Sequence, residues 1–139
     1  MGSSQSLTST AGDQSILDAL DKCLDAADKS LERLDRIDQN LANITARMSA
    51  DDHNSIARTQ NSLLRGPNDA IMPLRSPSTN LAIPGFPATP QAINQLQAAA
   101  ADTLLTALEL STDGSIAAKR ERIGIAIGLV VKRNVSEAP

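Results

Sequence analysis

The first residues of the chain match a pattern for covalent modification. Met1-Gly2-Ser3-Ser4-Gln5-Ser6 fits the N-myristoylation acceptor motif, in which removal of the methionine exposes Gly2 and a serine follows at the required position. In a eukaryotic or eukaryote-infecting source we expect Gly2 to be the lipidation site. One myristoyl chain binds a bilayer only weakly, so lasting attachment would need oligomerisation or a basic surface as a second signal.

The other reactive side chains do not combine into a catalytic set. The sequence holds one histidine, His53, and one cysteine, Cys23. His53 stands among polar neighbours, so we expect a solvated imidazole rather than a metal ligand. Acidic residues spread over a helix surface cannot complete a nucleophile, a base and an orienting group with these two. We therefore expect no enzymatic activity, no metal and no cofactor.

Three short motifs are weaker signs of chemistry. Gly124 and Gly128 have the spacing of a glycine pair in a phosphate-binding loop, but the Lys and the Ser or Thr that contact phosphate and magnesium are missing. Ser76-Pro77 and Thr89-Pro90 have the form of proline-directed kinase sites, which makes Ser76 and Thr89 candidate phosphorylation sites. Such dipeptides are common in disordered chains.

The composition favours helices buried against other helices. Among 139 residues there is one Phe, no Tyr and no Trp, while 41% of the residues are hydrophobic. Without large aromatic side chains a broad globular core is not expected. The chain has no apolar run near the roughly 20 residues that span a bilayer and no secretory signal, so we expect a cytoplasmic location. We predict an all-α fold that self-associates.

An apolar stripe with heptad spacing is the strongest pattern in the chain. Its members alternate at three and four residues, with two seven-residue gaps at the end, and predict a coiled-coil helix that begins near Gln14, with Asp13 as its N-cap. We define the stripe as Leu17, Leu20, Leu24, Ala27, Leu31, Leu34, Leu41 and Met48. It is more polar in its second half, at Asp38 and Thr45. The stripe is widened on one side by Ile16, Cys23, Ile37 and Ile44. This width favours a bundle of three or four chains, and the alternative is an intramolecular hairpin with a later helix.

Composition divides the chain into five segments. They are a flexible arm at 1–12, an oligomerisation region with a short following helix at 13–65, a Pro-rich flexible linker at 66–89, a helical hairpin at 90–133 and a tail at 134–139. The short helix has new N-cap candidates at Ser49, Asp51 and Asp52 and a helix-ending signal at Gly66-Pro67. Proline removes backbone donors, so the linker should be extended. Its Leu81, Ile83 and Phe86 could dock into a partner groove or be ordinary linker residues.

Two further helices are expected after the linker. Thr89 and Pro90 suit the N-cap and first position of a long helix that runs to Leu110. A turn follows at Asp113-Gly114, after which Ser115 can cap the last segment.

Two structures compete for that last segment. As a strand, it would alternate isoleucines with glycine and alanine from Ile123 onward. As a helix, it would place Gly124 and Gly128 one turn apart, so that another helix could approach closely. We favour the helix because the preceding Ala, Lys, Arg and Glu residues are strong helix formers. The expected contacts with a protein partner or an anionic membrane are Ile123, Gly124, Ile127, Gly128, Lys132 and Arg133.

Together these patterns predict a non-enzymatic, homo-oligomeric coiled-coil adaptor or scaffold of more than two chains. With Gly2 acylated, it would lie at the cytosolic face of a membrane. One alternative is an oligomeric nucleic-acid or nucleoprotein cofactor that uses the basic C-terminal segment. Few cations and no stacking aromatic accompany that segment, so such binding would be weak and electrostatic. The other alternative is a subunit of a hetero-oligomeric helical complex.

Overall fold

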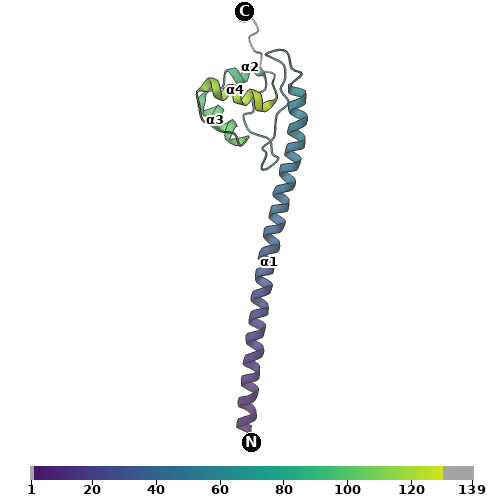
Figure 1. Ribbon diagram of the computed structural model, residues 1–139, viewed down its shortest axis with the longest axis vertical. Helices are drawn as coiled ribbons and strands as arrows, with labels where there is room; N and C mark the ends of the chain where they lie inside the picture. The colour runs from purple at the N-terminus through teal and green to yellow at the C-terminus, as the bar shows by residue number, and fades with distance from the viewer. Residues whose placement is uncertain (1, 130–139) are drawn as a thin grey trace, which may run out of the picture. The chain divides into compact units, whose positions relative to one another are not determined.

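The computed structural model describes residues 2–129, with side chains from residue 10 onward. Its helices are α1 (Gly2–Asn61), α2 (Pro90–Asn94), α3 (Ala98–Ala107) and α4 (Ile116–Ile127) (Figure 1). Within the described range there is no sheet, and the only β-pairing is a single bridge between Arg75 and Ala82. The prediction of an all-α fold with a long N-terminal helix and shorter helices after it is confirmed.

Helix α1 is longer than the sequence indicated. It begins at Gly2 rather than near Gln14, and it continues through Ser49 to Asn61 without a break. The expected flexible arm and the separate short helix are therefore both parts of α1, and Asp13 is an interior residue rather than a cap. Each residue added to a formed helix gains a hydrogen bond, and no proline precedes Pro67, so the cap-like side chains do not interrupt it.

The chain divides into two compact units, residues 1–42 and 43–139, and α1 contributes to both. The second unit has an aliphatic core, to which α1, the segment after it, and α2, α3 and α4 all contribute. Helix α4 packs against α3 and α2. The core consists of Ala57, Ile71, Leu74, Ile83, Ile93, Ala101, Leu104, Leu105, Leu108, Ile123 and Ile127. Small aliphatic side chains therefore build a shared core, which the lack of aromatic residues had argued against.

The Pro-rich segment 66–89 differs from the expected free linker. It is extended, but Leu74 is fully buried and Ile71 and Ile83 are 6% and 7% exposed. The Ile71 amide donates to the Ala88 carbonyl at 2.8 Å, which holds the two ends of the segment together. Burial of these apolar side chains outweighs the entropy that a mobile linker would keep.

Two buried asparagines of α1 hold this segment. The Asn54 amide accepts from the Arg75 N–H at 2.7 Å and donates to the Arg75 carbonyl at 2.9 Å. Asn61 accepts from the Met72 N–H at 2.8 Å and donates to the Met72 carbonyl at 3.0 Å and the Ile127 carbonyl at 3.0 Å. Asn54 and Asn61 are seven residues apart in a helix, and their partners Arg75 and Met72 are three residues apart in extended chain. Both separations span about 10 Å, so the two asparagines can pair with the segment at the same time.

The single long helix expected over residues 90–110 is divided into α2 and α3. Arg120 of α4 stabilises the break, because its guanidinium donates to the Leu96 carbonyl through Nε at 3.0 Å and through Nη2 at 2.6 Å. A carbonyl freed from a helix needs such a partner when it is partly buried.

The starts of α2 and α4 follow the predicted capping signals. Thr89 accepts from the Ala92 N–H at 3.2 Å as the N-cap of α2, and Ser115 accepts from the Ala118 N–H at 3.2 Å as the N-cap of α4. The predicted helix is confirmed over Ile116–Ile127, in place of the strand. It ends at Gly128, whose φ of 97° is the left-handed conformation that glycine adopts most easily.

Candidate association surface

The stripe is exposed along α1. Its leucines and Met48 are each between 52% and 63% exposed, and Ala27 is exposed as well. The widening residues Ile16, Ile37 and Ile44 have similar exposure, from 52% to 60%. Exposed apolar surface of this extent makes the stripe the candidate association surface of the chain.

The part of α1 that belongs to the second unit packs into the core with a different face of the helix. Ala50, Asn54, Ala57 and Asn61 are each no more than 1% exposed. If Leu17 is assigned heptad position a, the two alanines fall at f and the two asparagines at c, on the side away from a and d. Within the second unit the core therefore leaves the last a and d positions of the stripe, Thr45 and Met48, exposed.

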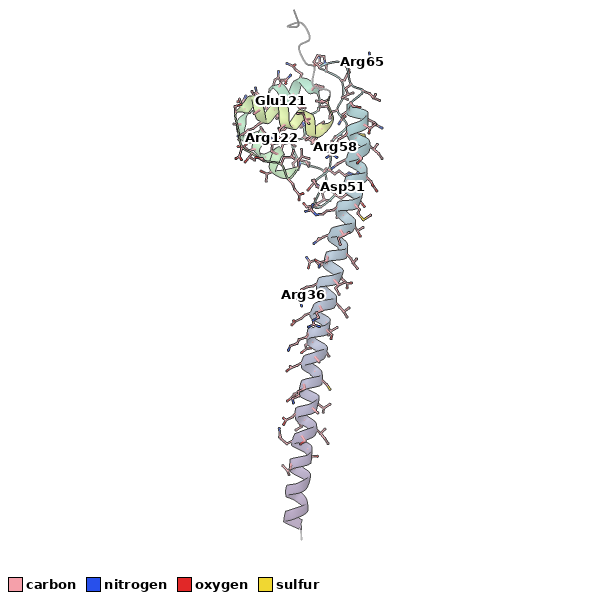
Figure 2. The ribbon with its side chains drawn as sticks, viewed as in Figure 1. Arg36, Asp51, Arg58, Arg65, Glu121 and Arg122 are labelled. Carbon is pink, nitrogen blue, oxygen red and sulfur yellow. The ribbon has the colours of Figure 1, made fainter. Side chains whose placement is uncertain are left out.

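Polar contacts reinforce that packing face. The Arg58 Nε donates to the Ala126 carbonyl at 2.8 Å, and Figure 2 shows this side chain pointing from α1 toward the shorter helices. The His53 Nε2 lies 3.1 Å from the Pro73 carbonyl oxygen. His53 is therefore half-buried beside the extended segment rather than solvated as expected.

An ion pair joins α1 to the end of α3. The Arg47 guanidinium donates to both Glu109 carboxylate oxygens, at 2.9 and 3.0 Å. These hydrogen bonds hold the pKa of the Glu109 carboxyl below its ordinary value and raise the pKa of Arg47. Glu109 has a φ of 60°, a conformation that costs a non-glycine residue energy, and the bidentate pair helps to hold it there.

The second unit also has an open hollow of about 710 Å³, between the turn after α1, α2 and α4. Its apolar lining includes Leu64, Pro67, Pro90, Ile93, Gly124 and Leu129, and charged lining comes from Arg65, Arg120 and Glu121. This volume falls in the range of small-ligand sites. A Cβ added at Gly124 would meet nothing within 4 Å, so this glycine leaves space in the hollow.

Most of the predicted partner contacts of the last helix that the structure describes are buried within the chain. Ile123 and Ile127 are fully buried in the core. Gly128 lies against α1, because a Cβ there would come within 2.5 Å of the Arg58 carbonyl oxygen. Among the predicted contacts that the structure describes, Gly124 alone lines the hollow. Lys132 and Arg133 lie outside the described residues.

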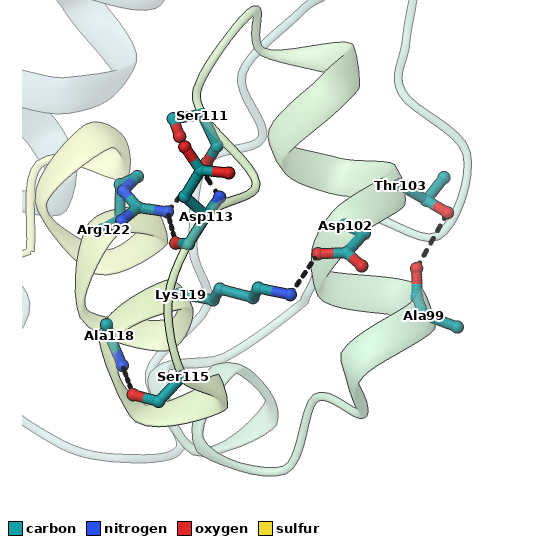
Figure 3. A network of polar contacts seen from close by, with 9 residues as sticks. All are labelled: Ala99, Asp102, Thr103, Ser111, Asp113, Ser115, Ala118, Lys119 and Arg122. Carbon is teal, nitrogen blue, oxygen red and sulfur yellow. Dashed lines mark hydrogen bonds and ion pairs between the residues drawn. The ribbon is translucent and has the colours of Figure 1, made fainter.

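The basic residues at the start of α4 make contacts within the chain. Lys119 is 13% exposed and its Nζ lies 2.7 Å from the Asp102 carboxylate of α3. The Arg122 guanidinium donates to the Ser111 and Asp113 carbonyls at 2.7 and 2.8 Å (Figure 3). These cations stabilise the α3–α4 pair, which reduces what they could offer to a phosphate backbone.

Both predicted phosphorylation sites are half-buried. The Thr89 hydroxyl caps α2, and the Ser76 hydroxyl lies 3.3 Å from that of Ser78 in a tight turn. A phosphate on Thr89 would have to replace the cap. Modification of Ser76, of Thr89 and of Gly2 stays a prediction.

Sequence reasoning missed the two asparagines that hold the extended segment. The available signal was a pair of residues with poor helix propensity, Asn54 and Asn61, seven residues apart within a helix. Their partners are backbone groups, which a sequence does not distinguish from one another.

Neither a metal-binding cluster nor a membrane-spanning helix is present in residues 2–129. No set of three or more His, Cys, Asp or Glu side chains is arranged to hold a metal ion in this part of the chain. None of the helices described combines the length and apolarity needed to cross a bilayer. Comparison with protein-family models, curated proteins and solved structures finds no match to the chain.

Proposed function

We propose that this chain is a non-enzymatic, oligomeric scaffold of the cytoplasm, in which α1 assembles copies of the chain and the second unit contacts a protein partner. The observation that carries the proposal is the exposure of the stripe on the helix face that the core does not use. A monomer would keep these side chains in water, at a cost of about 25 cal/mol for each Å² of apolar surface.

The width of the exposed surface supports more than two chains. Ile16, Ile37 and Ile44 lie beside the stripe and are as exposed as its leucines. A two-stranded coiled coil covers chiefly the a and d positions, whereas a larger bundle also buries a flanking column.

The test is the mass of the full chain in solution. Light scattering should give a multiple of 14.6 kDa for the wild type and a single-chain mass for Leu31→Glu/Leu34→Glu, because two carboxylates would enter the buried seam. The matched control is Gln39→Glu/Asn43→Glu, which adds the same charge at b and f positions and should leave the mass unchanged. A monomeric wild type would remove the proposal.

Membrane attachment through myristoylated Gly2 is the second part of the proposal, and it rests on the sequence motif. Intact-mass measurement of the protein from its native source should show the increment of one myristoyl group. The acylated protein should float with anionic vesicles, and Gly2→Ala should abolish both results. An unmodified terminus together with no vesicle binding would leave the scaffold without a membrane role.

A further inference from the structure

The stripe is asymmetric along α1. With Leu17 at position a, the a column is leucine in its first half and polar in its second, at Asp38 and Thr45. The d column stays apolar, with Ala27 as its one small member. These columns read Leu17, Leu24, Leu31, Asp38 and Thr45 at a, and Leu20, Ala27, Leu34, Leu41 and Met48 at d.

A parallel, in-register pairing conflicts with this asymmetry. It places each a residue opposite the same residue of the second copy, so two Asp38 carboxylates would face each other in the buried seam. Both would lose water without gaining an opposite charge. Ala27 would also face Ala27 of the second copy, and two such small side chains would leave a gap in that layer of the seam.

An antiparallel pairing resolves both conflicts. Reversing one helix sets a positions opposite d positions, and one register covers the whole stripe. Its layers are Leu17 with Met48, Leu24 with Leu41, Leu31 with Leu34, Asp38 with Ala27, and Thr45 with Leu20. The two aspartates are then in separate layers. Each lies beside a small alanine, which leaves the carboxylate a path to water.

The flanking columns favour the same direction. The g column holds Ile16, Cys23, Ser30, Ile37 and Ile44, whereas the e column holds Asp21, Asp28, Asp35, Ala42 and Ser49. Parallel helices bring g against e and would set Ile16 beside Asp21 and Cys23 beside Asp28. Antiparallel helices bring g against g, so that Cys23 lies beside Ile44 and Ser30 beside Ile37. The costs are Asp28 beside Asp35 in the e columns and Ile16 beside Asp51 at the ends of the g columns, each occurring twice by symmetry, and these carboxylates remain hydrated and screened.

We infer that the stripe binds the stripe of a second copy in antiparallel orientation, with Leu31 of each copy opposite Leu34 of the other. The inference rests on the proposed self-association and specifies its geometry. The apolar g columns of such a pair form a further strip along one side, where a second pair can pack.

Disulfide cross-linking of the full chain tests the orientation. In a Cys23→Ser background, Leu24→Cys and Leu41→Cys are made as separate variants and oxidised alone or after refolding together. In the inferred register, each introduced cysteine lies about 25 Å from its own counterpart, too far for a disulfide, but directly opposite the other. Cross-linked dimer should form only in the mixture. Leu20→Cys and Thr45→Cys, which lie opposite each other in the same register, should also cross-link only in the mixture. This second pair keeps the test valid if one of the first two substitutions prevents association.

The outcomes separate the two proposals. Efficient cross-linking of Leu24→Cys alone would overturn the antiparallel orientation and leave self-association standing. Absence of cross-linking in both mixtures, with both reduced mixtures still oligomeric by light scattering, would overturn the register. A wild-type chain that is monomeric would overturn the scaffold and the orientation together.

Discussion

Gly124 and Gly128 are one helical turn apart but serve different purposes. Gly124 is interior to α4 and borders open space, whereas Gly128 ends the helix in a left-handed conformation against the backbone of Arg58. The sequence suggested that the two act as one close-packing pair. Their roles differ because α1 contacts α4 at the C-terminal end of α4, beside Gly128, and not beside Gly124.

This difference predicts opposite effects of one substitution. Gly124→Ala should raise the free energy of unfolding by up to about 1 kcal/mol, because alanine is the better helix former and the added methyl meets no atom. Gly128→Ala should lower it by about 2 kcal/mol or more, through its φ of 97° and the contact with Arg58. Urea denaturation monitored by circular dichroism measures both. Equal effects would show that α1 does not approach Gly128 in solution.

At the scale of elements, the Arg47–Glu109 pair predicts a pH-dependent link between α1 and the end of α3. Folding lowers the Glu109 pKa, so the pair stabilises the fold above the ordinary glutamate pKa of about 4.3 and loses this effect as pH falls through the lowered value. Wild type should therefore melt at a higher temperature than Glu109→Gln at neutral pH, and the gap should narrow as pH falls below the ordinary glutamate pKa and close below the lowered pKa of Glu109. The control Glu121→Gln removes an exposed carboxylate outside the pair and should leave the melting temperature at neutral pH near that of the wild type. A gap that persists at low pH would assign the effect to the backbone of residue 109 instead.

The sequence was informative about elements wherever local signals decide the structure. The long helix, the caps at Thr89 and Ser115 and the stripe all follow from spacing and side-chain chemistry. The break between α2 and α3 and the packing of residues 66–89 depend on contacts distant in sequence. Arg120 satisfies the Leu96 carbonyl from 24 residues away, and Asn54 holds Arg75 from 21 residues away. Helical periodicity does not reveal such partners.

For the whole molecule, the two units should respond differently to dilution. The second unit has its own aliphatic core, whereas the stripe residues of the first unit are exposed in the single chain. Association alone can then protect the first unit, and its stability should rise with protein concentration by mass action. Helix content measured by circular dichroism should fall on dilution in the wild type but be constant in Leu31→Glu/Leu34→Glu. The transition of the second unit should stay at one urea concentration in both proteins. Constant wild-type helicity across dilution would contradict this prediction.

The continuity of α1 has a consequence for binding strength. Helix α1 carries the stripe and also contributes residues to the core of the second unit. Every chain that enters a bundle therefore adds one copy of the hollow beside Gly124. The copy number of the bundle is therefore the valency of the scaffold. A ligand that is itself repeated, such as an array of identical subunits, would be retained by avidity even where each hollow holds it only weakly.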